Sequence, residues 1–75
     1  MEKNVYAIFD SPANRTILTY LGISFEARGG RIYFEWEPSK ENFMRLVEAL
    51  RTLGYAHSDE YAAKVATSFF LNRVA

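Results

Sequence analysis

The sequence places two arginines on either side of a glycine pair, in the stretch EARGGRIY at residues 26–33. Two consecutive glycines between strand-forming residues favour a two-residue type I′ turn, which sets Arg28 directly opposite Arg31. Tyr33 follows on the same face of the hairpin. Paired guanidinium groups with an aromatic ring behind them can contact a phosphate and a stacked base, and arginine and tyrosine are also frequent at protein–protein hot spots. The hairpin tip is therefore the first candidate binding site.

Glutamates share the arginine-bearing face of this hairpin. Glu26 and Glu35 fall on it, and Glu37 continues the row. Carboxylates are hard oxygen ligands of the kind that hold Mg²⁺ or Ca²⁺. No spacing typical of a metal-binding loop accompanies them, however, and both arginines occupy the same surface. We expect the glutamates to balance the arginines in solvent, with no metal and no cofactor.

Few residues are suited to catalysis. The sole histidine, His57, is followed directly by Ser58 and Asp59. A nucleophile, a base and an orienting acid must converge in space, which three consecutive residues at the start of a helix do not do. Ser58 and Asp59 are better explained as the cap and first turn of a helix. We therefore expect a protein that is not an enzyme.

Composition and charge narrow the class of protein. The chain has 75 residues and no cysteine, so one core must stabilise it without disulfides. Nine basic and nine acidic residues give a formal net charge of zero, which removes the field that non-specific DNA or membrane binders use. No apolar run has the length of a membrane span, and the N-terminus does not resemble a signal peptide. We expect a single domain over residues 1–75, cytoplasmic and without a membrane partner.

Hydrophobic periodicity predicts the order strand, helix, strand, strand, helix, helix. Residues 4–9 form the first strand, which is apolar on both faces, so that Tyr6 and Ile8 lie on a face that is covered or meets a partner. Three segments have the apolar spacing of helices, at 10–22, 40–53 and 58–73. The prediction is an α+β fold in which a three-stranded sheet carries its helices on one face. The first strand lies beside the hairpin, and if the strands run parallel the first helix is a right-handed crossover.

A turn at Gly29-Gly30 also fixes the register of the hairpin, pairing residue 28 with 31 and continuing to 23 with 36. The core-facing pairs are then Ala27 with Ile32, Phe25 with Phe34, and Ile23 with Trp36. The charged residues of the hairpin and Tyr33 fall on the opposite face.

Apolar residues beyond the needs of one core favour a protein–protein interface. We expect a small non-catalytic binding protein without a small-molecule substrate, in which one contact surface is formed by Arg28, Arg31, Tyr33, Glu35 and Glu26 and a second by Phe70 and Leu71. The second face of the first strand, with Tyr6 and Ile8, adds to the exposed apolar area. Two alternatives remain open. One is a nucleic-acid-binding module that uses the arginine tip, and the other is a solvated tip, paired with Glu26, in a chain whose Phe70 wraps the core.

The stretches LTYLGI and YFEWE, on either side of a glycine hairpin, carry a resemblance. The sequence resembles a family of short uncharacterised proteins of phages and mobile elements, in which a Leu-x-x-x-Gly-Ile helix end precedes a glycine hairpin and a Phe-x-Phe/Trp-Glu strand. The resemblance implies no catalytic residues, because the family has no assigned activity. It implies docking on a larger host complex, as inhibitors of host defence such as anti-CRISPR proteins do. A homodimeric accessory factor is the other form that we expect such a protein to take.

Overall fold

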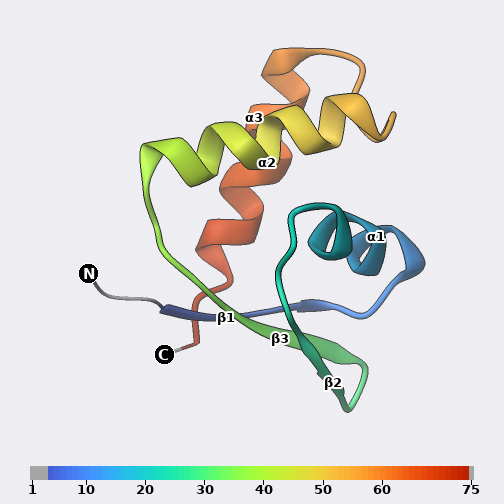
Figure 1. Ribbon diagram of the computed structural model, residues 1–75, viewed down its shortest axis with the longest axis vertical. Helices are drawn as coiled ribbons and strands as arrows, with labels where there is room; N and C mark the ends of the chain where they lie inside the picture. The colour runs from blue at the N-terminus through green and yellow to red at the C-terminus, as the bar shows by residue number, and fades with distance from the viewer. Residues whose placement is uncertain (1–3, 75) are drawn as a thin grey trace.

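The computed structural model describes residues 4–74, whose elements follow one another in the predicted order (Figure 1). Their bounds are β1 Asn4–Phe9, α1 Pro12–Tyr20, β2 Glu26–Arg28, β3 Arg31–Trp36, α2 Lys40–Thr52 and α3 Asp59–Leu71. The strands form one open sheet with the helices on one side of it, which confirms the predicted α+β fold. None of the helices in this part of the chain combines the length and apolarity needed to cross a membrane.

The central strand of the sheet is β3. It pairs antiparallel with β1 on one side and with β2 on the other, in the order β1-β3-β2. The first strand therefore lies beside the hairpin, as predicted, but it has no parallel neighbour. Because β3 is inserted between β1 and β2, which run in the same direction, α1 connects two strands that do not pair. Antiparallel sheets of this kind commonly leave one face uncovered.

Each of the three helices in residues 4–74 begins at a serine. The hydroxyl oxygens of Ser11, Ser39 and Ser58 accept the backbone N–H three residues further on, at 3.1, 3.0 and 3.1 Å. Each bond satisfies an N–H group that the first helical turn leaves unpaired, which stabilises the helix by about 1 kcal/mol. The caps therefore determine the residue at which each helix begins. For α1 and α2, they also determine the length of the link from the preceding strand.

Asp10 joins β1, α1 and the hairpin turn. Its carboxylate accepts two hydrogen bonds from the guanidinium of Arg15, at 2.7 and 2.8 Å. These bonds, with the positive charge of Arg15, lower the pKa of Asp10 because they favour its ionised form. The backbone N–H of Asp10 donates to the carbonyl of Gly30 at 3.0 Å. One residue thus holds the start of α1 close to the turn.

The core lies between the sheet and the helices. Its large members are Tyr6, Ile8, Ile17, Leu18, Leu21, Ile32, Phe34, Trp36, Leu46, Leu50 and Phe69. Tyr6 and Ile8 are buried, so the prediction that they add to the exposed apolar area is wrong. Alternation could not tell which apolar face of β1 is covered. The pairing with β3 decides it, because Tyr6 lies opposite Phe34 and Ile8 opposite Ile32, on the face toward the helices.

Residues 72–74 cover the outer edge of β1. They pair antiparallel with this strand, with Arg73 opposite Tyr6. The N–H of Ala7 donates to the carbonyl of Asn72 at 3.0 Å, and the N–H of Val74 donates to the carbonyl of Val5 at 2.8 Å. These bonds occupy backbone groups that could otherwise recruit another strand. They also place Val74 beside Val5.

Candidate functional site

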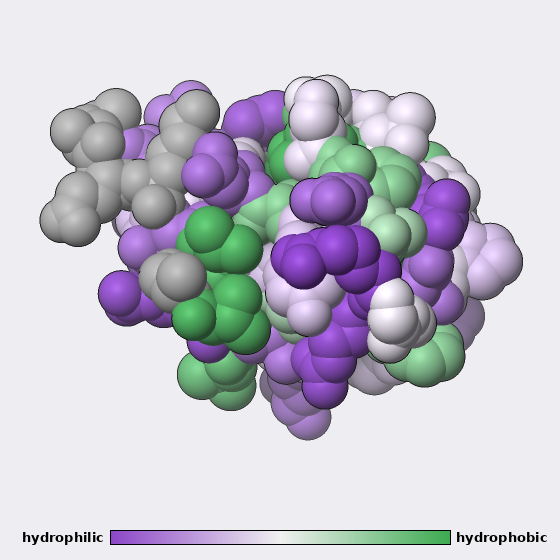
Figure 2. Space-filling model, turned by 90° about the horizontal axis from the view of Figure 1, so that it is seen from below, coloured by the Kyte–Doolittle hydropathy of each residue, from purple (hydrophilic) through white to green (hydrophobic). Residues whose placement is uncertain are grey.

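The helices of residues 4–74 leave one face of the sheet uncovered, and this face is called the open face below (Figure 1). Alternation along the paired strands places on it Val5, Ala7 and Phe9 of β1, Arg31, Tyr33 and Glu35 of β3, and Glu26 and Arg28 of β2. Figure 2 looks onto this side and shows hydrophilic side chains across its middle, with hydrophobic groups beside them. All the hairpin residues predicted to form a contact surface therefore lie together.

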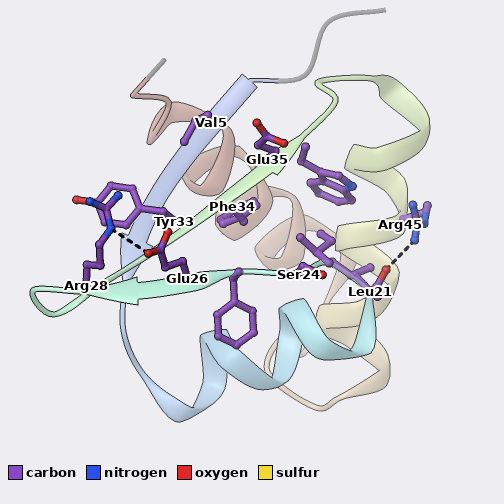
Figure 3. Close-up of a pocket in the computed structure, with 13 residues that line it drawn as sticks. Val5, Leu21, Ser24, Glu26, Arg28, Tyr33, Phe34, Glu35 and Arg45 are labelled. Atoms are coloured by element: carbon purple, nitrogen blue, oxygen red, sulfur yellow. Dashed lines mark hydrogen bonds and ion pairs between the residues drawn. The ribbon is translucent and has the colours of Figure 1, made fainter.

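Arg28 is held by two neighbours on the open face (Figure 3). Its Nε lies 3.8 Å from Oε2 of Glu26, and its guanidinium carbon lies 4.3 Å from the centre of the Tyr33 ring. At exposed positions an ion pair and a cation–π contact each contribute up to about 1 kcal/mol. Both contacts direct the guanidinium over Tyr33, so the charge of Arg28 need not face its register partner Arg31. Glu26 thus pairs with an arginine, as one alternative from the sequence expected.

Arg31 has different surroundings. Its register partner on β1 is Phe9, whose residue surface is 73% exposed. Among residues 4–74, no carboxylate lies within ion-pair distance of Arg31. An exposed phenyl ring and an arginine without an ionic partner in that range therefore lie side by side. Sequence reasoning missed Phe9, because only the register of β1 with β3 places it on the open face.

The hairpin opens after its first pairs, and a hollow of about 740 Å³ lies in the gap (Figure 3). The pairs 28/31, 27/32 and 26/33 form as predicted, whereas the ladder does not extend to 25/34, 24/35 and 23/36. Hydrogen bonds to the helices hold the chain away from β3. The N–H of Ile23 donates to the carbonyl of Leu18 at 2.9 Å, and Arg45 of α2 donates to the carbonyl of Leu21 at 3.1 Å.

The hollow combines aromatic and charged groups. Its lining includes Phe25, Trp36, Glu26, Glu35 and Arg45, and the Arg45 guanidinium carbon lies 5.9 Å from the centre of the Trp36 ring. Such a lining suits a side chain of a partner, which could combine apolar contact with a hydrogen bond to a carboxylate or a guanidinium. Within residues 4–74, no three His, Cys, Asp or Glu side chains gather closely enough to hold a metal ion.

The prediction that Ala27 faces the core is wrong. Ala27 lies opposite Ile32, as the register requires, but it is exposed like the rest of β2. Figure 1 shows the reason, since the hairpin tip projects away from the helices. The correct register therefore does not bury every residue on the helix-facing side.

Of the three residues first considered for catalysis, Ser58 and Asp59 make contacts that stabilise the fold. His57 is exposed in the link between α2 and α3. Ser58 accepts the N–H of Tyr61 at 3.1 Å, and Asp59 accepts a hydrogen bond from Arg51 at 2.6 Å. The predicted capping role of Ser58 is confirmed.

Phe70 and Leu71, which were predicted to form a second contact surface, line one hollow together but differ in exposure. Phe70 is half-buried, with its ring centre 5.6 Å from those of Tyr6 and Trp36 and 6.2 Å from that of Phe43. Leu71 is 79% exposed. Phe70 thus packs against the core, while Leu71 remains accessible to a partner.

Comparisons with protein-family models, curated proteins and solved structures found no significant match to this chain. The chain is an α+β protein whose antiparallel sheet is covered by helices on one face only. Function must therefore be inferred from the geometry of its surfaces.

Proposed function

We propose that the protein is a non-catalytic binding protein that docks its open face on another protein. The observation that carries this proposal is the exposure of apolar side chains beside an ordered polar cluster. Phe9 is exposed on β1 next to the turn, and Val74, 56% exposed, lies beside Val5 at the outer edge of β1. On the neighbouring strands β3 and β2, Arg28 is fixed over Tyr33. Exposed apolar anchors next to oriented arginine and tyrosine side chains are typical of protein-binding surfaces.

The charge balance of the open face favours a protein over a nucleic acid. Arg28 and Arg31 are offset by Glu26 and Glu35 on the same strands. A phosphate backbone attracts a surface with excess positive charge, and carboxylates on that surface repel it. A protein partner can instead present groups that complement both signs.

A nucleic-acid-binding function is the alternative, and one observation favours it. Phe9 and Arg31 are neighbours, so a base could stack on the ring while the guanidinium contacts a phosphate. Tyr33 supports this function less well than its sequence position suggests, because Arg28 already covers its ring. The experiment that tests the proposal must therefore distinguish nucleic-acid binding from protein binding.

The resemblance to proteins of phages and mobile elements would make the partner a host complex. Inhibition of such a complex needs no chemistry from the inhibitor, since occupation of a functional surface is sufficient. The proposal therefore includes an inhibitor of host defence as one form of the binding protein.

The test is affinity capture followed by reconstitution. The wild-type protein, Phe9→Ser and Arg31→Glu are immobilised separately and exposed to lysate of cells in which the protein is naturally made. Tyr20→Ser is the matched control, because Tyr20 is 52% exposed on α1, away from the open face. A captured protein is then purified and titrated by calorimetry. We expect each open-face variant to bind at least about tenfold more weakly, and the control to bind like the wild type.

Two results would overturn the proposal. In the first, the purified partner binds Phe9→Ser and Arg31→Glu as tightly as the wild type. In the second, the wild type retains no protein but shifts single- or double-stranded RNA or DNA in a gel, and Arg31→Glu abolishes the shift. Thermal unfolding of every variant checks that the loss of binding does not come from loss of the fold.

A further inference from the structure

Residues of α2 and α3 line an apolar groove. These helices lie on the far side of the sheet from the open face (Figure 1). It consists of two hollows of about 400 and 380 Å³ that share Phe43 as a lining residue. The first is lined further by Lys40, Phe70 and Leu71, and the second by Met44 and Val47, among others. Met44 is 54% exposed, and the adjoining Leu71 is the most exposed large apolar residue among 4–74.

A line of three exposed residues on α2 borders this groove. Lys40, Met44 and Glu48 are four residues apart, so they lie on the same side of the helix, each about 6 Å further along its axis. Lys40 lines one hollow and Glu48 the other. Arg51 and Asp59 also line the second hollow, but they pair with each other at 2.6 Å. With that pair neutral, the groove has a positive end at Lys40, an apolar centre at Met44 and a negative end at Glu48.

The contacts within the described chain do not explain these two charges. Lys40 is the first residue of α2, where the helix dipole disfavours a positive charge. Among residues 4–74, neither Lys40 nor Glu48 takes part in an ion pair. A partner with a negative group opposite Lys40 and a positive group opposite Glu48 would therefore complement the groove.

We propose that the α2–α3 groove is the interface with a second copy of this chain, related to the first by a two-fold axis that passes beside Met44. A two-fold axis brings the same surface of both copies together and here sets the two α2 helices antiparallel. Lys40 of each copy then lies opposite Glu48 of the other, because both residues are equally far from Met44. Met44 of one copy meets Met44 of the other at the axis.

A dimer of ordinary size would cover only a small part of this chain. A standard interface buries roughly 800 Å² per partner, about one sixth of the 4894 Å² that this chain exposes. Met44, Leu71 and Phe43 would supply its apolar centre, with Lys40 and Glu48 at the rim. This inference does not depend on the proposed function of the open face.

The first test measures molar mass by light scattering across a dilution series. We expect a dimer for the wild type and a dimer dissociation constant raised at least about tenfold by Met44→Glu, which buries two carboxylates at the axis. The matched control is Tyr20→Glu, since Tyr20 has nearly the same exposure on α1. It should leave the dimer unchanged. A wild type that stays monomeric at the highest concentration, or a dimer that Met44→Glu does not weaken, would overturn the proposal.

The second test exchanges the charges. Lys40→Glu and Glu48→Lys each place like charges opposite one another and should weaken the dimer, whereas both changes in one chain reverse the pattern and should restore it. A mixture of the two single variants should form a heterodimer that is tighter than either homodimer. Lys40→Glu also removes a cation from the start of α2, so it should not destabilise the monomer. Failure of both the double variant and the mixture to recover would refute the antiparallel pairing.

Discussion

Arg28 and Arg31 have the same side chain and different surroundings, and the register of the sheet accounts for the difference. Arg28 lies two residues after Glu26 on β2 and diagonally across from Tyr33, so both can hold it. Arg31 lies between Arg28 and the exposed ring of Phe9. Fixing Arg28 in advance reduces the conformational entropy that docking would cost. Arg31 is the residue with more contacts still to gain from a partner.

At the residue scale, the turn depends on two glycines in the left-handed region, with φ of 55° at Gly29 and 81° at Gly30. A Cβ added at either would meet nothing within 4 Å, so any cost comes from the backbone alone. Gly30→Ala should lower the free energy of unfolding by about 1 kcal/mol. Gly29→Asn should change it by less than about 0.5 kcal/mol, since Asn-Gly is a preferred type I′ pair. Urea unfolding measures both, and equal losses would contradict a type I′ turn.

At the scale of elements, local patterns predicted the helices and the first hairpin pairs because their causes are local. Serine caps act within three residues, and the glycine pair fixes the register beside it. The rest of the hairpin follows contacts that are distant in sequence. Arg45 reaches the carbonyl of Leu21 from α2, 24 residues away, and alternation in residues 23–25 carries no sign of it.

The candidate site was likewise predictable only where it depends on local sequence patterns. The alternation of β3 correctly places Arg31, Tyr33 and Glu35 on one face. Phe9 and Val74 join that face only through pairing partners from other parts of the chain, Arg31 and Val5. A strand that is apolar on both sides does not reveal which side a helix will cover. The apolar part of the open face therefore required the structure.

The end of α3 offers a prediction that separates packing from accessibility. Phe70→Ala should lower the free energy of unfolding by about 2 kcal/mol, because it removes a half-buried ring that contacts Tyr6, Trp36 and Phe43. Leu71→Ala, one residue later, should cost less than about 0.5 kcal/mol, since exposed side chains contribute little to folding. Chemical unfolding of the two variants provides the comparison. A loss at Leu71 as large as that at Phe70 would mean that Leu71 is covered in solution, and the dilution series would show whether the dimer covers it.

At the scale of the whole molecule, the chain presents two separate surfaces. The open face lies on one side of the sheet, and the α2–α3 groove belongs to the helical layer on the other (Figure 1). With zero formal net charge, neither surface gains from a long-range field, so selectivity must come from local patterns of charge and apolar contact. Dimerisation through the groove would leave both open faces accessible.

Such a dimer would carry two open faces that point away from each other, because the groove lies on the opposite side of the sheet, and this leads to a prediction that combines the two proposals. In solution the dimer should bind two molecules of the partner protein, one on each open face, whereas the monomeric Met44→Glu variant should bind one. The affinity of each open face should be the same in both proteins, because the groove and the open face do not overlap. Phe9→Ser should weaken binding in the dimer and in the monomer, because it removes an anchor from each open face. Light scattering with excess partner measures the molar mass of the complex, and calorimetry measures the affinity of each face. If the wild-type dimer binds only one partner molecule, or if Met44→Glu binds the partner more weakly per open face, the two surfaces do not act independently.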